Sequence, residues 1–100
     1  MEVYTPGFNK IKELIMNEIL KFIGQRLEAS SRRINEFVLE LKNEKIKEDR
    51  AFELIDFTYS SPYSSQVDDL LFDMVRRCIV KETRNGYKLT SHGLELVSSL

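Results

Sequence analysis

The sequence is poor in the residues that build metal centres and covalent cross-links. Cys78 is its only cysteine and His92 its only histidine in 100 residues. One cysteine excludes an internal disulfide, and the two residues together are too few for a zinc site of nitrogen and sulfur ligands. Counting leaves an oxygen-ligand site open, but no calcium loop of spaced acidic residues around a glycine is present. We therefore expect no metal and no cofactor.

Long apolar runs are also lacking. The most apolar stretch, residues 11–23, is interrupted by four charged residues and an asparagine. It is too short and too charged to span a bilayer. No basic, then apolar, then small-residue signal opens the chain. These absences predict a cytoplasmic protein without a membrane partner.

Catalytic signatures are missing as well. The sequence has no Gly-x-Ser-x-Gly, no glycine-rich phosphate loop and no His-Glu-x-x-His. His92 has no neighbour in the sequence that would make it a metal ligand or a catalytic base. The protein is therefore expected not to be an enzyme.

Charge is nearly balanced overall but unevenly distributed. Fifteen Lys and Arg face sixteen Asp and Glu, for a net charge of −1. This balance excludes a polybasic protein, and 42% hydrophobic with 31% charged residues indicates one globular domain over residues 1–100. Residues 74–90 nevertheless carry a net charge of +4, which leaves −5 for the remainder. A local basic surface of this kind favours nucleic acid.

The N-terminal half predicts two helices after a flexible arm at residues 1–6. Apolar residues recur at three- and four-residue steps over Phe8–Ile23, and Leu14 belongs to this stripe. Gly24 is a plausible end for the first helix. Ser30 or Ser31 is a suitable N-cap for the second. Its apolar face would be formed by Ile34, Phe37, Val38 and Leu41.

The stretch Ala51–Tyr59 fits two patterns. Phe52, Leu54 and Phe57 suit a helical face, whereas Phe52, Leu54 and Tyr59 alternate as in a strand. We favour a short helix that ends near Phe57. The choice decides whether a compact helix-turn-helix exists.

A third helix is predicted at residues 64–77. Either Ser61 caps it with Pro62 in the first helical position, or Ser64 or Ser65 is the cap. The apolar stripe predicts that Cys78 is a buried, inert thiol. The stripe consists of Val67, Leu70, Leu71, Met74, Val75 and Cys78.

A hairpin and a last helix complete the chain. Residues 79–89 are rich in strand formers on either side of Asn85-Gly86, a pair typical of two-residue type I′ turns. Such a turn would place Arg84 opposite Tyr87. Thr90 would cap a final helix. Its buried side would be formed by Leu94, Val97 and Leu100.

Helices followed by a capped helix and a hairpin are typical of a winged helix-turn-helix, a mainly α fold with a small β hairpin (α+β). The segment from Arg76 to Glu82 and then Asn85-Gly86-Tyr87-Lys88-Leu89-Thr90-Ser91-His92-Gly93 resembles the wing of small prokaryotic and archaeal winged-helix regulators. That resemblance implies a dimeric transcription factor. Cys78 stands where those regulators usually have glycine.

A weaker resemblance lies just upstream. Tyr59-Ser60-Ser61-Pro62-Tyr63-Ser64 is similar to the aromatic-x-Gly-Pro-Tyr-Ser turn of SocA-like antitoxin and adaptor domains, with Ser61 in place of glycine. This second resemblance implies a protein-interaction module that does not bind DNA. The two resemblances cover residues 59–97, under half of the chain.

The first interpretation, a sequence-specific regulator of double-stranded DNA, assigns contacts to the third helix and the basic wing. A charged, solvated hairpin edge explains the wing equally well, and Asp68, Asp69 and Asp73 oppose DNA binding by the helix. Arg26, Arg32 and Arg33 would add phosphate contacts or simply solvate a loop. The predicted DNA-binding residues are Ser64, Ser65, Gln66, Arg76, Arg77, Lys81, Arg84, Asn85 and Lys88.

Protein contacts are predicted at three apolar residues. Ile15 and Ile19 belong to the wide stripe of the first helix, which one small domain is not expected to cover, and this suggests a homodimer. Phe72 points away from the stripe of its own helix. It would either anchor another protein partner or pack under the wing or against the N-terminal arm.

Overall fold

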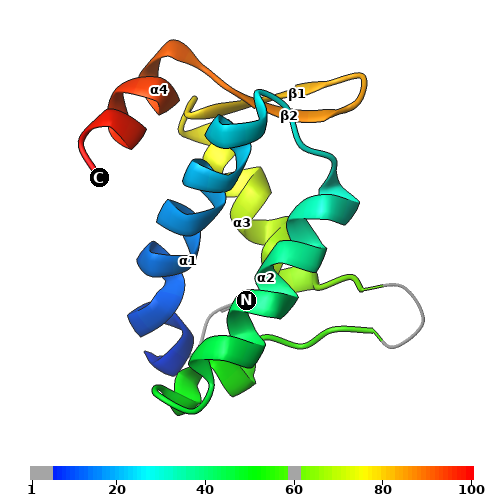
Figure 1. Cartoon of the computed structure of the whole chain (residues 1–100), viewed down its shortest axis with the longest axis vertical. Coiled ribbons are helices and arrows are strands. Elements are labelled where there is room, and N and C mark those ends of the chain that lie inside the picture. Colours follow the sequence, from blue (N-terminus) through cyan, green and yellow to red (C-terminus); the bar gives the residue numbers. More distant parts are fainter. Residues whose placement is uncertain (1–5, 59–61) are drawn as a thin grey trace.

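The computed structural model describes residues 6–58 and 62–100, over which four α-helices, one 3₁₀ helix and one two-stranded hairpin follow each other (Figure 1). The predicted class, mainly α with a small β hairpin, is confirmed. The predicted arm lies outside the described residues except for Pro6. The elements are α1 (Pro6–Arg26), α2 (Ser31–Lys45), η1 (Arg50–Leu54), α3 (Ser65–Arg76), β1 (Val80–Thr83), β2 (Gly86–Leu89) and α4 (Ser91–Ser98).

Helix α1 is the centre of the core. The stripe predicted from the sequence is buried against α2, η1, β2 and α4, apart from Leu14, which is exposed. Figure 1 shows α1 and α2 in front of α3, with the hairpin and α4 at one end. Gly24 does not end α1 as expected. The helix continues to Arg26 and ends at Leu27, whose φ of +67° lies in the left-handed region.

Side-chain caps begin three of the helices as the sequence predicts. The Ser30 hydroxyl accepts a hydrogen bond from the Arg33 amide at 3.2 Å, and the Thr90 hydroxyl accepts one from Gly93 at 3.1 Å. Ser64, one of the three predicted alternatives, caps α3. Ser61 lies outside the described residues. These caps satisfy amide groups that have no partner within the helix.

The connection between α2 and α3 differs from the prediction. Residues 50–54 form a 3₁₀ helix capped by Asp49, and Ile55 is already extended, so the helix ends at Leu54 and not near Phe57. Burial of Phe52 and Ile55 holds this connection on the core. Helices α2 and α3 are therefore not joined by the turn of about three to four residues that is usual in a helix-turn-helix.

A buried amide ties the two helices together across this connection. The Asn35 side chain donates to the Ser31 carbonyl at 2.9 Å and accepts from the Ser64 amide at 2.8 Å. Because a buried polar group is costly without partners, these bonds set where α3 begins relative to α2.

The hairpin is shifted from the predicted register. Thr83 pairs with Gly86 and Glu82 with Tyr87, so the turn consists of Arg84 and Asn85. Neither residue has the positive φ that a type I′ turn requires. Gly86 has a φ of +147°, and a Cβ there would lie 2.2 Å from the Ala29 carbonyl oxygen. The close approach of the α1–α2 connection explains both the glycine and the register.

Two hydrogen bonds join that connection to β2. The Ala29 amide donates to the Tyr87 carbonyl at 2.9 Å, and the Tyr87 amide donates to the Ala29 carbonyl at 2.8 Å. The hairpin is thereby held along its second strand, and its position relative to α1 and α2 is set by backbone bonds.

Two predictions at the C-terminal end of the chain are wrong. Cys78 is exposed, with a φ of +62°, because α3 ends at Arg76 and the chain turns out of the helix after its C-cap, Arg77. A left-handed conformation of this kind favours glycine, the residue that the wings of small winged-helix regulators usually have at this place. Leu94 and Leu100 are also exposed, and only Val97 of the predicted set packs on the core.

Candidate nucleic-acid interface

The hairpin separates apolar and basic side chains onto its two faces. Val80 pairs with Leu89, and both are buried on the inner face. Lys81 pairs with Lys88 one position further, so both lysines project from the outer face and are exposed. Like charges directly opposite each other destabilise a strand pair. The lysine pair therefore does not add to the stability of the hairpin.

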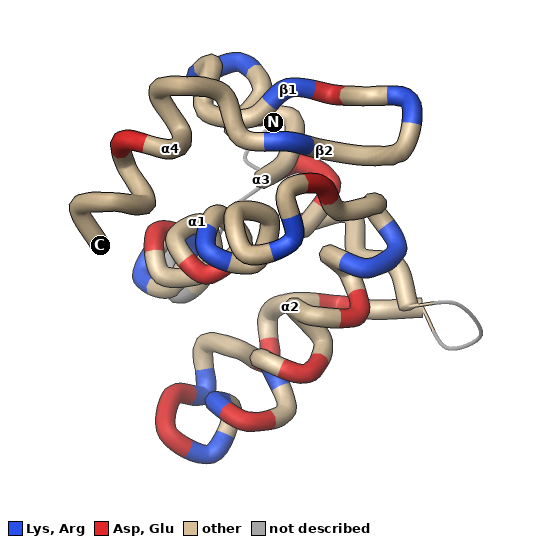
Figure 2. The backbone as a smooth tube through the Cα atoms, turned by 45° about the horizontal axis from the view of Figure 1, so that its top comes forward, with Lys and Arg blue, Asp and Glu red and all other residues tan. Residues whose placement is uncertain are grey.

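The cations of the hairpin lack carboxylate partners. Within the part of the chain that the structure describes, Lys81, Arg84 and Lys88 form no ion pair. Figure 2 shows these three basic positions along the strands and at the tip. Seven cations elsewhere have a carboxylate oxygen at 2.8–3.9 Å: Lys10, Lys12, Lys21, Arg32, Lys45, Arg50 and Arg77. The hairpin thus carries three basic residues that form no ion pair, against one acidic residue, Glu82, on its strands.

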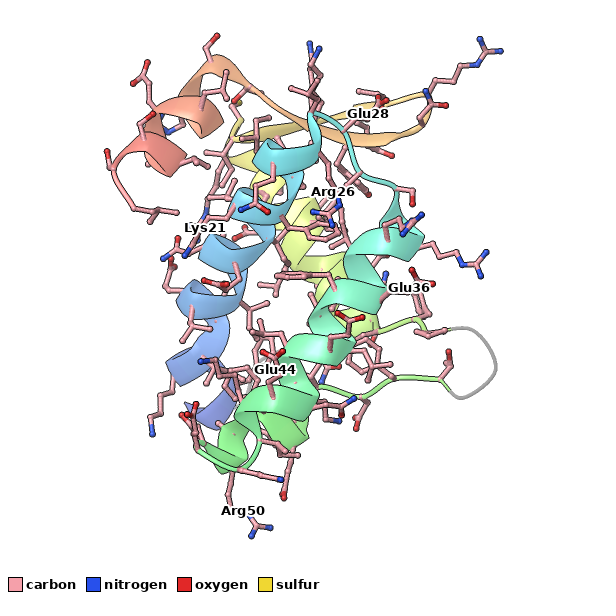
Figure 3. The ribbon with its side chains drawn as sticks, in the orientation of Figure 1. Lys21, Arg26, Glu28, Glu36, Glu44 and Arg50 are labelled. Carbon is pink, nitrogen blue, oxygen red and sulfur yellow. The ribbon has the colours of Figure 1, made fainter. Side chains whose placement is uncertain are left out.

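The tip of the hairpin is held by Glu28. The Thr83 hydroxyl donates to one carboxylate oxygen of Glu28, and the Asn85 side-chain amide donates to the other at 3.5 Å. Glu28 lies beside the hairpin at the start of the α1–α2 connection (Figure 3). Asn85, a predicted DNA contact, is exposed, and its side-chain amide is shared with Glu28. Arg84, between the two anchored residues, remains exposed.

A second basic segment adjoins the hairpin at the α1–α2 connection. The Arg26 guanidinium lies 3.9 Å from the centre of the Phe22 ring, which stacks on Phe37 at 4.4 Å. Figure 3 shows Arg26 on the side of α1 that faces α2. Arg32 is paired with Glu36 at 3.4 Å on its own helix. Arg26, Arg32 and Arg33 are all exposed, which keeps open the phosphate contacts considered from the sequence.

The N-terminal end of α3 is occupied by internal hydrogen bonds. Ser64 is buried, and its hydroxyl caps the helix. The Gln66 side chain donates to the Leu54 carbonyl and accepts from the Asp56 amide at 3.0 Å. These two predicted DNA-binding residues instead hold the connection that precedes α3. Ser65 alone of the three predicted residues at this end is exposed.

The outer face of α3 is acidic and partly apolar. It presents Asp68 and Phe72, which is 65% exposed as the sequence indicated. The Tyr63 hydroxyl lies 3.4 Å from an Asp68 carboxylate oxygen, and the negative charge of Asp68 raises the pKa of Tyr63. Burial raises the pKa of Tyr87, with further contributions from the charges of Glu82 and Asp68.

The two arginines at the end of α3 differ. Arg77 lies 3.1 Å from Asp73 and 3.9 Å from Glu13, so it is held by carboxylates of α3 and α1. Lys12 also approaches Asp73, at 3.9 Å. Arg76 is exposed and forms no ion pair with a carboxylate of the described residues. Of this pair, only Arg76 extends the basic surface of the hairpin.

The predicted homodimer contacts need correction. Ile15 and Ile19 have no exposed surface, because α2, η1 and the hairpin cover the wide stripe of α1 within one chain. They have no surface to offer a second copy. Phe72 is the one predicted partner residue that stays accessible.

Glu28 and Ala29 contribute to this site but were not identified from the sequence. Their partners, Thr83, Asn85 and Tyr87, lie more than fifty residues away in the chain. Neither residue belongs to a recognisable motif. Only the three-dimensional pairing with the hairpin reveals their role.

Over the described residues, no group of three His, Cys, Asp or Glu side chains is arranged to hold a metal ion. No helix in the same part of the chain has the length and apolarity that crossing a membrane requires. Comparison with protein-family models, curated protein sequences and solved structures finds no match to this chain.

Proposed function

We propose that this protein is a winged-helix, sequence-specific regulator that binds double-stranded DNA mainly through the outer face of its hairpin. The order of three helices and a hairpin supports the winged-helix assignment. The observation that carries the function is the exposed, unpaired set Lys81, Arg84 and Lys88 on a hairpin anchored to the α1–α2 connection.

Each of these cations has a distinct role in the proposal. Lys81 and Lys88 contact phosphates, and their mutual repulsion is relieved when a phosphate binds between them. Arg84 at the tip enters a minor groove, where arginine responds to groove width and negative potential. Arg76, Arg26 and Arg33 add peripheral phosphate contacts.

Helix α3 has a smaller role than the winged-helix resemblance implies. Ser64 and Gln66 are occupied, and Asp68 would face phosphates without a compensating charge. The hairpin therefore contributes most of the affinity, and sequence preference depends on the tip.

The direct test is titration of a labelled duplex of arbitrary sequence at several salt concentrations. We expect a dissociation constant of ~10⁻⁴ to 10⁻⁶ M at physiological salt, with the logarithm of the affinity falling linearly with the logarithm of salt. Lys81→Gln and Lys88→Gln should each reduce this slope by about 1.

Lys47→Gln is the matched control, since Lys47 is an exposed lysine beyond α2, at the end of the molecule opposite the hairpin (Figure 1). Its affinity and slope should match the wild type. Absence of binding at low salt would contradict the proposal, as would equal slopes for all three variants and the wild type.

A second candidate function is that of a protein-interaction module, favoured by the exposed Phe72 beside Asp68 and Asp69. An exposed aromatic with acidic neighbours suits a basic partner surface. A photoreactive residue at position 72 should then cross-link one discrete partner in cells. Phe72→Asp should abolish that interaction without altering DNA binding or thermal stability.

A further inference from the structure

A small hollow between α1 and α2 is lined by charged side chains of both signs. Its volume is about 100 Å³. None of the three hairpin cations proposed above as DNA contacts lines it. Figure 3 labels one lining residue on each helix, Arg26 and Glu36. The lining side chains are Phe22 and Arg26 from α1 and Arg33, Glu36, Phe37 and Glu40 from α2.

The aromatic side of the hollow orients one of its arginines. Phe22 stacks on Phe37 with ring centres 4.4 Å apart, and the Arg26 guanidinium lies over the Phe22 ring at 3.9 Å. Phe22 is buried, so this stack is held at the edge of the core. A guanidinium that rests on an aromatic ring keeps its N–H donors for a planar anion such as a carboxylate.

The charges around the hollow are not paired with each other. Arg26, Arg33 and Glu40 are exposed, and none of them forms an ion pair within the described residues. Glu36 is paired at 3.4 Å with Arg32, which does not line the hollow. The hollow therefore offers donors to an anionic group and acceptors to a cationic group at the same time.

The two signs are separated along α2. Arg33 lies near the start of the helix, and Glu36 and Glu40 follow it on the next turns of the same face. One helical turn rises about 5.4 Å, so a single small molecule can be reached from both sides. Glu36 and Glu40 are four residues apart, a spacing at which like charges repel each other. An occupant would place its anionic end toward Arg26 and Arg33 and its cationic end toward the glutamates.

The size and the charges of the hollow together limit its occupant. Pockets for drug-sized ligands have volumes of ~300 to 1,000 Å³, so this hollow encloses only a few non-hydrogen atoms. Glu36 and Glu40 would repel a purely anionic ligand, and the two arginines would repel a purely cationic one. A small zwitterion satisfies both conditions.

We propose that this hollow binds a free α-amino acid. Arg26 and Arg33 hold its carboxylate, Glu40 and Glu36 hold its ammonium group, and the Phe37 ring contacts the start of its side chain. The carboxylate uses the arginines assigned above to peripheral phosphate contacts. Binding of the amino acid needs no DNA, however, and the proposal does not depend on the proposed function.

Amide NMR shifts of the labelled protein, titrated with L-alanine in the absence of DNA, test the proposal. Because the contacts are few and partly exposed to solvent, we expect a roughly millimolar dissociation constant. Saturable shifts should appear at residues 22–26 and 33–40. Propionate lacks the ammonium group of alanine and ethylamine lacks its carboxylate. At equal ionic strength, each should bind at least about tenfold more weakly than alanine.

Variants of α2 separate this site from general surface charge. Arg33→Gln and Glu40→Gln should each weaken alanine binding about tenfold. Glu44→Gln is the matched control, since Glu44 is an exposed glutamate of the same helix that does not line the hollow (Figure 3). It should bind like the wild type. Arg32→Gln releases Glu36 from its ion pair and should bind at least as tightly.

Three results would each overturn the proposal. The first is the absence of saturable shifts at L-alanine concentrations about tenfold above the expected dissociation constant. The second is binding of propionate or ethylamine as tight as that of alanine. The third is undiminished binding in both Arg33→Gln and Glu40→Gln.

Discussion

The outer face of the hairpin and the outer face of α3 lie near each other in the sequence but carry opposite charges. The hairpin presents Lys81, Arg84 and Lys88 without carboxylate partners, whereas α3 presents Asp68 and Phe72. Both faces are exposed. The basic and the acidic residues therefore lie on different elements, the hairpin and α3.

This difference shows that strand pairing determines the face of the hairpin on which each charged side chain lies, whereas composition gives only the number of charges. Residues 74–90 carry a net charge of +4 as a segment. The register places both hairpin lysines on the same face of the hairpin. Arg77, by contrast, is paired with Asp73 of α3 and Glu13 of α1. The binding of a polyanion depends on the charge that the outer face of the hairpin presents. In the described residues, no carboxylate of α3 forms an ion pair with a cation of that face.

The largest expected effect comes from Gly86→Ala, which would detach the hairpin and remove the basic face as a unit. The added Cβ would meet the Ala29 carbonyl oxygen at 2.2 Å, and φ is +147°. Strain and overpacking together should lower the free energy of unfolding by about 3 kcal/mol. Urea denaturation measures this change. DNA affinity should fall with it.

Gly24→Ala is the matched control for that prediction. A Cβ there meets only the end of the flexible Leu89 side chain, at 3.2 Å, and Gly24 lies inside a helix, where alanine is favoured. Its stability should change by less than about 1 kcal/mol. Equal losses for both glycines would show that the close approach at Gly86 is not the cause.

Removing charge from each face sharpens the comparison. The double variant Lys81→Gln/Lys88→Gln should lose roughly 10- to 100-fold in duplex affinity at low salt, because two charge-assisted contacts disappear. The variant Asp68→Asn/Asp69→Asn should change affinity by less than about threefold, since these carboxylates lie on the other face. Fluorescence anisotropy measures both. A strong gain for the aspartate variant would place α3 against the DNA.

Glu28 provides a smaller effect whose sign is informative. If Glu28 acted only as a negative charge near the hairpin, Glu28→Ala would strengthen DNA binding. Because it also holds Thr83 and Asn85, we expect Glu28→Ala to weaken binding severalfold. Glu28→Gln keeps an acceptor and loses the charge, so it should bind at least as tightly as the wild type. Tighter binding by both variants would rule out the positioning role.

The smallest effect concerns pH. Burial raises the pKa of Tyr87 above 10.0, so the folded protein keeps a proton that the unfolded chain releases. This contribution is fully present below pH 10 and is lost as pH rises through the folded-state pKa. Tyr87→Phe should therefore lose less stability than the wild type between neutral and strongly alkaline pH in thermal melts. Tyr63→Phe should change the pH dependence in the same direction, because the negative charge of Asp68 also raises the pKa of Tyr63.

Local signals predicted most of the secondary structure. The cap at Thr90, the cap at Ser30 (one of two predicted positions) and the apolar stripe of α3 from Val67 to Met74 depend on neighbours within one or two helical turns, and these are confirmed, whereas Cys78 lies beyond the helix. The hairpin was located correctly, but its turn was placed one residue late. Its register depends on the approach of Ala29 to Gly86, which no local pattern encodes.

The errors in predicted exposure have a second physical cause, which is contact with parts of the chain that lie outside the local pattern. Polar residues at the start of a helix are often exposed, which favours Ser64 and Gln66 as ligand contacts. In the structure, Ser64 caps α3, and Gln66 forms hydrogen bonds with the backbone of Leu54 and Asp56. Leu94 follows the helical pattern of a buried residue, yet it is exposed, whereas Val97 of the same helix packs on the core. Pattern establishes which side of an element a residue occupies, while long-range packing decides what covers that side.

The most direct test of the account compares the two faces in one experiment, the titration of unlabelled duplex DNA into isotopically labelled protein followed by amide NMR shifts. The account predicts the largest shifts at residues 81–88, with smaller ones at residues 26–33. Amides from Asp68 to Phe72 should scarcely move. Largest shifts at residues 65–72 with an unmoved hairpin would contradict the assignment of the basic outer face as the DNA-binding surface.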